Sequence, residues 1–131
     1  MDVTDISIRL KYKINYWFSL KEEFDTLTTK RDKTKQRIIK ETNKIKEINN
    51  KDKSVNIEVI QRYVDLDNLL IDLDNKLNNI NKEMYHVFQL VYDVMLRLRI
   101  KTIISVVDGK KHKICLGKDF MFTKEPLAPV K

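Results

Sequence analysis

The sequence predicts a mainly α protein: a long antiparallel two-helix coiled-coil hairpin followed by a small C-terminal β-hairpin or meander. Three observations predict this class. Between Val59 and Leu98, twelve successive heptad positions are apolar and alternate in steps of four and three, the seam of a coiled-coil helix. Residues 49–54 are rich in Asn and Asp, which favour turns. Residues 102–116 hold β-branched residues around Asp108-Gly109, a strong hairpin-turn signal. The seam residues are Val59, Tyr63, Leu66, Leu70, Leu73, Leu77, Ile80, Met84, Val87, Val91, Val94 and Leu98.

Length and composition favour one domain made of a few long elements. The 131 residues are about one domain's worth of chain, so we expect a single domain over 1–131. Only two glycines and two prolines interrupt a chain that is 34% charged and carries a net charge of +7. Lys, Ile and Asn are abundant, and because their codons are rich in A and T, we infer an A+T-rich genome, as in low-GC bacteria, phages, viruses or some protists.

The first helix is predicted over residues 4–48, and its seam is less apolar than that of the second helix. In the register of the seam, polar residues occupy several positions of the first helix; these are Lys13, Arg31, Thr34 and Glu41. A loop over 49–54 leads to the second helix, predicted over 55–100, and so short a connection makes the helices antiparallel neighbours. Residues 30–53 carry net +6 and residues 54–95 net −4, so opposite charges meet, with Arg31 expected near Asp72.

The period of the sequence then changes from helical to extended. We expect strands over 102–107 and 110–116, and a third short strand within 120–123, so that the β element covers 102–123. Two prolines, Pro126 and Pro129, mark an extended tail over 124–131. A lone hairpin is marginal in water, so the β element should lie on the aromatic ends of the two helices.

No constellation of residues predicts catalysis, and we expect no enzyme activity, no cofactor and no metal. The aspartate pairs of residues 65–67 and 72–74 are spaced by two, so on a helix the members of each pair point apart. His112 and Cys115 are an odd number of residues apart, so on a strand they face opposite sides. No glycine-rich phosphate loop or serine nucleophile motif is present.

Localisation is predicted to be intracellular and cytoplasmic. Acidic residues, Asp2 and Asp5, stand where a signal peptide would need basic ones, and no run of 18 apolar residues could span a membrane. A single cysteine, Cys115, excludes an internal disulfide and fits a reducing compartment.

Apolar residues outside the seam indicate a protein-binding role. The second helix has more of them than one partner helix can cover, and the first predicted strand adds a β edge. The predicted interface residues are Ile60, Val64, Leu69, Ile71, Ile103, Ile104 and Val106. We therefore expect a structural or assembly subunit that binds other protein subunits as a homo- or hetero-oligomer, and the composition favours a phage or viral particle as its setting.

Two alternatives remain open. A nucleic-acid-binding accessory protein would use a basic C-terminal cluster, and its residues would be Arg97, Arg99, Lys110, Lys111 and Lys113. Helices joined to a β-hairpin at one end also resemble prefoldin subunits in outline, which implies a chaperone or adaptor. In prefoldin the hairpin lies between the helices, whereas here it follows both, and no motif matches.

Overall fold

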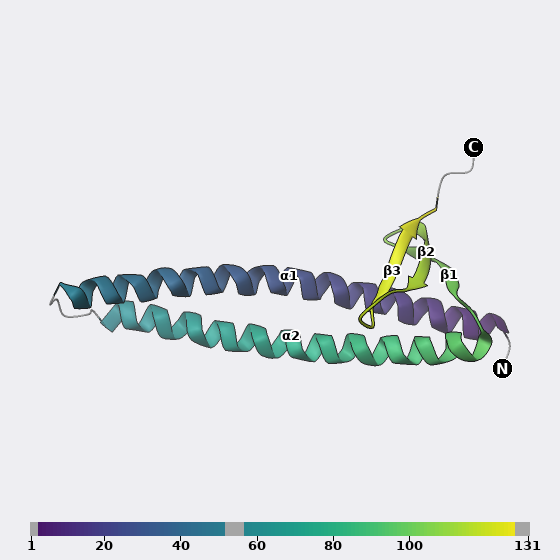
Figure 1. Cartoon of the computed structure of the whole chain (residues 1–131), viewed down its shortest axis with the longest axis horizontal. Helices are drawn as coiled ribbons and strands as arrows, with labels where there is room; N and C mark the ends of the chain where they lie inside the picture. Colours follow the sequence, from purple (N-terminus) through teal and green to yellow (C-terminus); the bar gives the residue numbers. More distant parts are fainter. Residues whose placement is uncertain (1–2, 52–56, 128–131) are drawn as a thin grey trace. The chain divides into compact units, whose positions relative to one another are not determined.

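The chain folds as two long antiparallel helices followed by a three-stranded antiparallel sheet, as the sequence predicts (Figure 1). The computed structural model describes the backbone of residues 3–51 and 57–127, and the side chains of residues 8–49, 51 and 57–127. Helix α1 covers Val3–Asn50 and helix α2 covers Ile57–Leu98. The strands are β1 (Thr102–Val107), β2 (Lys110–Leu116) and β3 (Phe122–Pro126), in the order β1-β2-β3. Of the loop predicted over 49–54, residues 49 and 50 belong to α1, and residues 52–54 lie outside the described residues.

The chain divides into two compact units, which are described in turn. The head unit comprises residues 1–23 and 80–131, and therefore the start of α1, the end of α2 and the sheet. The helical unit comprises residues 24–79, and therefore the remaining parts of the two helices.

The core of the head unit lies between the two helix segments and one face of the sheet. Alternation along the strands turns one set of side chains inward, including Val107, Ile114 and Phe122, and all three are buried. Beneath them, Trp17 of α1 is only 1% exposed, and Phe88 of α2 is buried. The ring of Phe122 lies 5.2 Å from that of Trp17 and 4.8 Å from that of Phe88, so aromatic contacts join the sheet to both helices.

The β1–β2 hairpin has the turn that its sequence predicts. Asp108 and Gly109 both have positive φ, at 53° and 78°, and Val107 pairs with Lys110. Two positive φ values in a two-residue loop define the type I′ turn, whose twist matches that of the strands. The hairpin register follows from it, with Val106 opposite Lys111 and Ile104 opposite Lys113.

The third strand starts two residues later than predicted and runs on through Pro126, so part of the expected tail is strand. The reason is the loop before it. Asp119 and Phe120 both adopt positive φ, at 59° and 60°, and the Gly117 amide donates a hydrogen bond of 2.7 Å to the carbonyl of Met121. These residues reverse the chain, so Phe120 belongs to the turn and cannot belong to the strand.

Helix α2 ends in a Schellman motif. The amide of Ile100 donates to the carbonyl of Met95 at 2.8 Å, and the amide of Arg99 donates to that of Leu96 at 3.2 Å. Arg99 takes the left-handed conformation at φ 54°, where glycine is usual. This turn leads the chain directly into β1.

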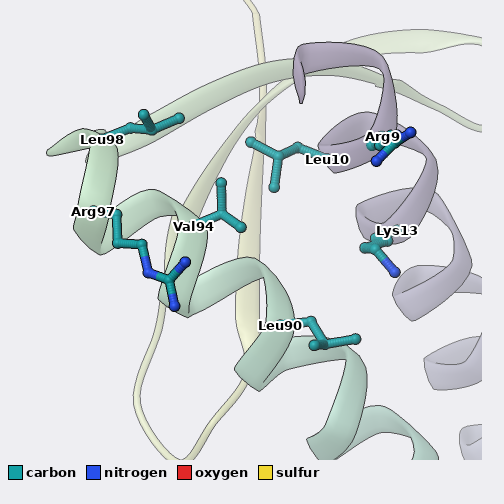
Figure 2. A pocket seen from close by; sticks show the side chains of 7 residues that line it. All are labelled: Arg9, Leu10, Lys13, Leu90, Val94, Arg97 and Leu98. Carbon is teal, nitrogen blue, oxygen red and sulfur yellow. The ribbon is translucent and has the colours of Figure 1, made fainter. Parts of the chain in front are cut away.

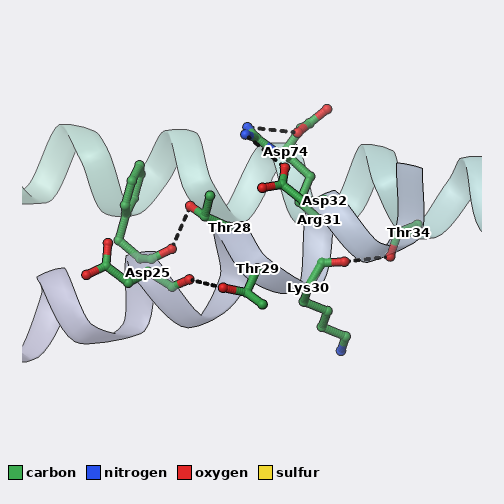
Figure 3. Close-up of polar contacts among 9 residues, drawn as sticks. Asp25, Thr28, Thr29, Lys30, Arg31, Asp32, Thr34 and Asp74 are labelled. Carbon is green, nitrogen blue, oxygen red and sulfur yellow. Dashed lines mark hydrogen bonds and ion pairs between the residues drawn. The ribbon is translucent and has the colours of Figure 1, made fainter. Parts of the chain in front are cut away.

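The helical unit has a core with few large side chains. Leu66, Leu73 and Leu77 of α2 are buried, while most seam residues contributed by α1 are half-buried. Thr34 is 3% exposed, and its hydroxyl donates a 2.9 Å hydrogen bond to the carbonyl of Lys30 (Figure 3). Thr34, one of the polar residues predicted to interrupt the α1 seam, is therefore buried in the helical unit.

An ion pair links the two helices within this unit. Arg31 Nη1 lies 3.8 Å from Asp74 Oδ1 (Figure 3), and its Nη2 lies 3.6 Å from Asp32. Asp74 lies two residues beyond Asp72, the neighbour expected for Arg31. Asp72 instead pairs with Lys76 of its own helix at 3.1 Å. Arg31 therefore does pair with an aspartate of α2, two residues along the helix from the one expected.

Candidate protein-binding surfaces

The outer face of the sheet carries exposed apolar side chains on β1 and exposed basic side chains on the neighbouring strand β2. Ile104 and Val106 of β1 are 54% and 47% exposed, and their partners across the hairpin, Lys113 and Lys111, are exposed too. The alternation of the strand requires this placement, because Ser105 and Val107 turn inward and are buried. Two of the predicted interface residues therefore share one exposed surface, which we call the sheet face.

Strand β1 is an edge strand, since it pairs only with β2 in the described sheet. Its outward-directed amides and carbonyls can pair with an added strand, and edges of this kind are a common mode of protein recognition. Ile103, the third residue predicted for this edge, is half-buried and belongs to the inward-facing set. It supports the sheet from within, and only Ile104 and Val106 are presented to a partner.

A second exposed apolar surface lies on α2 within the helical unit. Ile57, Ile60, Val64 and Ile71 are between 40% and 77% exposed, and separations of three, four and seven residues place them on one helix face. We call this face the outer stripe. Because the buried seam residues of this unit, such as Leu66 and Leu73, occupy a different face, the stripe is not covered by α1.

Leu69, also predicted for this surface, lies elsewhere. It is half-buried, and its position on the helix is on the opposite side of the seam from Ile60. Three of the four predicted α2 interface residues are thus brought together, and Ile57 joins them. The sequence signal for Ile57 is its spacing of seven from Val64, which identifies it as a member of the same stripe.

The head unit contains a groove that sequence reasoning missed. It is a hollow of about 360 Å³ between the start of α1 and the end of α2. Its lining residues are Arg9, Leu10, Lys13, Leu90, Val94, Arg97 and Leu98. Figure 2 shows leucine and valine side chains projecting from both helices toward the space between them, with the cationic side chains around them. We call this feature the cationic groove.

The groove has a physical origin in the seam. Lys13 occupies a seam position of α1, where an apolar residue would otherwise fill the space opposite Val94. A lysine extends its charged end toward water and leaves the neighbouring apolar surface uncovered. Leu98, the last residue of the predicted seam, accordingly remains 46% exposed. The combination of a lysine at a seam position and an apolar helix end was the signal available in the sequence.

The basic residues predicted to contact nucleic acid are divided among several places. Lys111 and Lys113 share the sheet face, and Lys110 is exposed beside the type I′ turn. Arg97 lines the cationic groove, whereas Arg99 forms the Schellman turn. Only the lysines of β2 therefore form the compact basic cluster that the sequence predicts.

Two buried polar side chains lie on the inward face of the sheet. His112 is buried opposite Ser105, and its Nδ1 lies 2.9 Å from the carbonyl oxygen of Lys110. Within the described ranges, 3–51 and 57–127, no three His, Cys, Asp or Glu side chains are grouped as metal ligands would be. Over the same described residues, neither helix has a stretch long and apolar enough to span a membrane.

Comparison with known proteins adds no family to this description. No protein-family model matches the chain, and no curated protein or solved structure shows a significant match to it.

Proposed function

We propose that the chain is a non-enzymatic structural or assembly subunit that binds other protein chains. The observation that carries this proposal is the sheet face with its open edge, where Ile104 and Val106 are exposed side by side with lysines. An edge strand with exposed apolar residues can pair non-specifically with strands of other chains, and proteins usually protect such edges. The apolar outer face of this unprotected edge therefore supports the proposal that a specific protein partner covers it.

The outer stripe gives the proposal a second, separate surface. Ile60, Val64 and Ile71 lie on a helix face that α1 does not cover. A subunit with two apolar surfaces on different elements can contact more than one neighbour, as assembly components do. The abundance of Lys, Ile and Asn, which indicates an A+T-rich genome, supports a phage or viral particle as the setting of this role.

Site-specific photo-crosslinking tests the sheet face. A photo-crosslinking amino acid in place of Val106 should form protein adducts of discrete mass in an extract of the source cells. The same amino acid in place of Gln36, an exposed residue of α1, is the matched control and should form few. Ile104→Lys should abolish the adducts at position 106 while the far-UV circular dichroism stays unchanged. Equal labelling at both positions would contradict the proposal.

A nucleic-acid-binding role is the second candidate, and one observation favours it. Lys111 and Lys113 alternate with inward residues, so they project from the same face of β2 with Lys110 close in sequence. Phosphate contacts by such lysines would make binding fall steeply with salt. Lys111→Glu with Lys113→Glu should then release the chain from a DNA or RNA column. Retention that is unaffected by these changes would exclude this cluster as the contact.

A further inference from the structure

The outer stripe and the cationic groove are complementary in charge as well as in apolar character. The α2 segment that bears the stripe, residues 57–74, carries five carboxylates and one arginine. The α1 segment that bears one wall of the groove, residues 8–20, carries three cations and no carboxylate. Opposite charges around two apolar surfaces favour their association and set its orientation.

The exposed residues of the stripe belong to a seven-residue sequence repeat. An apolar residue followed at once by an acidic one recurs every seven residues, as Ile57-Glu58, Val64-Asp65 and Ile71-Asp72. On the other flank of the stripe, Asp67 and Asp74 repeat at the same interval. Within one chain, Asp74 also pairs with Arg31 and Asp72 with Lys76. An apolar row with charged rows on both sides is the arrangement of a coiled-coil contact, with the charges selecting the partner. Helix α2 thus carries a second heptad row besides the seam.

The groove offers the matching surface. Its apolar floor, Leu10, Leu90, Val94 and Leu98, comes from two helices, so a third helix can lie along it. Lys13 and Arg97 stand on opposite helices at its margins. From Leu90 to Leu98 the floor runs about 12 Å along α2, and from Ile57 to Val64 the stripe runs about 10 Å. Two turns of the stripe therefore span the length of the floor.

We propose that the occupant of the cationic groove is the outer stripe of a second copy of this chain. The contact joins two different patches, the head unit of one copy and the helical unit of the next. Such a heterologous contact either continues from copy to copy or closes when two or more copies satisfy it mutually. This inference rests on the proposed function, because it names the partner of one of the two surfaces assigned there.

Two variants that each remove one side of the contact give a decisive test. Leu90→Glu places a carboxylate in the groove and leaves the stripe intact. Ile60→Glu with Val64→Glu places carboxylates in the stripe and leaves the groove intact. All three residues are exposed by at least 39%, so the fold should tolerate the changes. Ile39→Glu, at a 52% exposed isoleucine of α1 in the helical unit, is the matched control.

Sedimentation velocity from micromolar to millimolar protein provides the measurement. The wild-type chain and Ile39→Glu should increase in mass with concentration, and each contact variant alone should remain at 15.7 kDa with at least tenfold weaker association. An equimolar mixture of the two contact variants should form a 1:1 pair of about 31 kDa, since one supplies an intact stripe and the other an intact groove. If Leu90→Glu loses helicity, Lys13→Glu with Arg97→Glu serves as the groove variant.

Several outcomes would overturn the inference. A wild-type chain that stays monomeric at every concentration would assign the groove to another occupant, such as an acidic helix of a different protein or an apolar carboxylate. A mixture of the two variants that does not pair would exclude contact between groove and stripe, even if the wild type associates. The crosslinking at position 106 is read separately. Discrete adducts there, together with a monomeric wild type, would leave the proposed function standing without this contact.

Discussion

The ring of Trp17 on α1 meets the ring of Phe122 on β3 edge to face, with centroids 5.2 Å apart and planes at 85°. Both side chains are buried, and Trp17 also lies edge to face with Phe18 at 5.0 Å. Aromatic pairs of this geometry contribute about 0.5–1.5 kcal/mol beyond the area that they bury. Together with the contact between Phe122 and Phe88, and in addition to the pairing of β3 with β2, this contact fixes the far edge of the sheet to the helices.

Removal of the Phe122 ring should weaken the head unit severely. Phe122→Ala leaves a cavity beside Trp17 and Phe88, and we expect a loss of about 3–5 kcal/mol in the free energy of unfolding. Urea unfolding followed by the emission of Trp17, the only tryptophan, measures it directly. Tyr12→Ala removes an aromatic ring that is 73% exposed and should change stability by about 0.5 kcal/mol at most. Similar urea midpoints for the two variants would show that the ring contact does not secure the sheet.

Arg99→Gly should stabilise the protein. Arg99 has φ 54°, which costs a residue with a Cβ about 1–2 kcal/mol. Glycine avoids this strain, but it lowers the stability by about 0.5–1 kcal/mol because it has more conformational freedom in the unfolded chain. We expect a net gain of about 0.5–1 kcal/mol and a melting temperature higher by a few degrees. Arg97→Gly, inside the last turn of α2, should instead lower the melting temperature. A lower melting temperature for both variants would refute the role of Arg99 as the helix cap.

The two glycines should differ in their tolerance of alanine. At Gly109 a Cβ would meet nothing within 4 Å, so Gly109→Ala pays only the strain of φ 78°, about 1 kcal/mol. At Gly117 a Cβ would lie 2.8 Å from both the Met121 carbonyl oxygen and Thr123 Cγ2, and the overpacking costs about 1–3 kcal/mol. Thermal unfolding should rank Gly117→Ala as the more harmful. Thr123→Ser removes Cγ2 and should recover part of the loss at Gly117 but none at Gly109.

A buried threonine limits the stability of the helical unit. Thr34→Val keeps the shape of the side chain and removes a hydroxyl whose acceptor, the Lys30 carbonyl, already takes part in the helix hydrogen bonds. We expect a gain of about 0.5–1 kcal/mol in unfolding free energy. Thr29 makes the same bond, 3.1 Å to the Asp25 carbonyl, but is exposed. Thr29→Val should therefore change little, and an equal gain from both would attribute the effect to helix propensity and not to burial.

The sequence predicted the features that depend on periodicity and short-range turn chemistry. The seam from Val59 to Leu98 and the short connection before it determine an antiparallel pair of helices, and the structure confirms that pair. The Asp108-Gly109 turn was predictable because two positive φ values suit that dipeptide. In both cases the deciding residues are neighbours along the chain or repeat at a fixed interval.

Features that depend on tertiary contacts could not be predicted in this way. Asp119 and Phe120 adopt left-handed conformations although neither is a glycine, and Phe120 packs edge to face on Tyr85 with ring centroids 4.9 Å apart. The cationic groove exists only where α1 and α2 segments seventy or more residues apart lie side by side. Likewise, Ile103 and Ile104 are equivalent by composition, and the register of the sheet alone determines that one faces inward and the other outward.

The two units differ in how many large side chains they bury, and this difference predicts which unit unfolds locally first. Among the described residues, six large side chains are less than 2% exposed; Leu73 belongs to the helical unit, and Trp17, Ile14, Met95, Ile114 and Val91 belong to the head unit. Segments with few buried apolar contacts open at lower free energy, so amide protons of the helical unit should exchange with solvent before those of the head unit. Any neighbour that binds the outer stripe would suppress this opening, so that assembly itself would complete the rigidity of the chain.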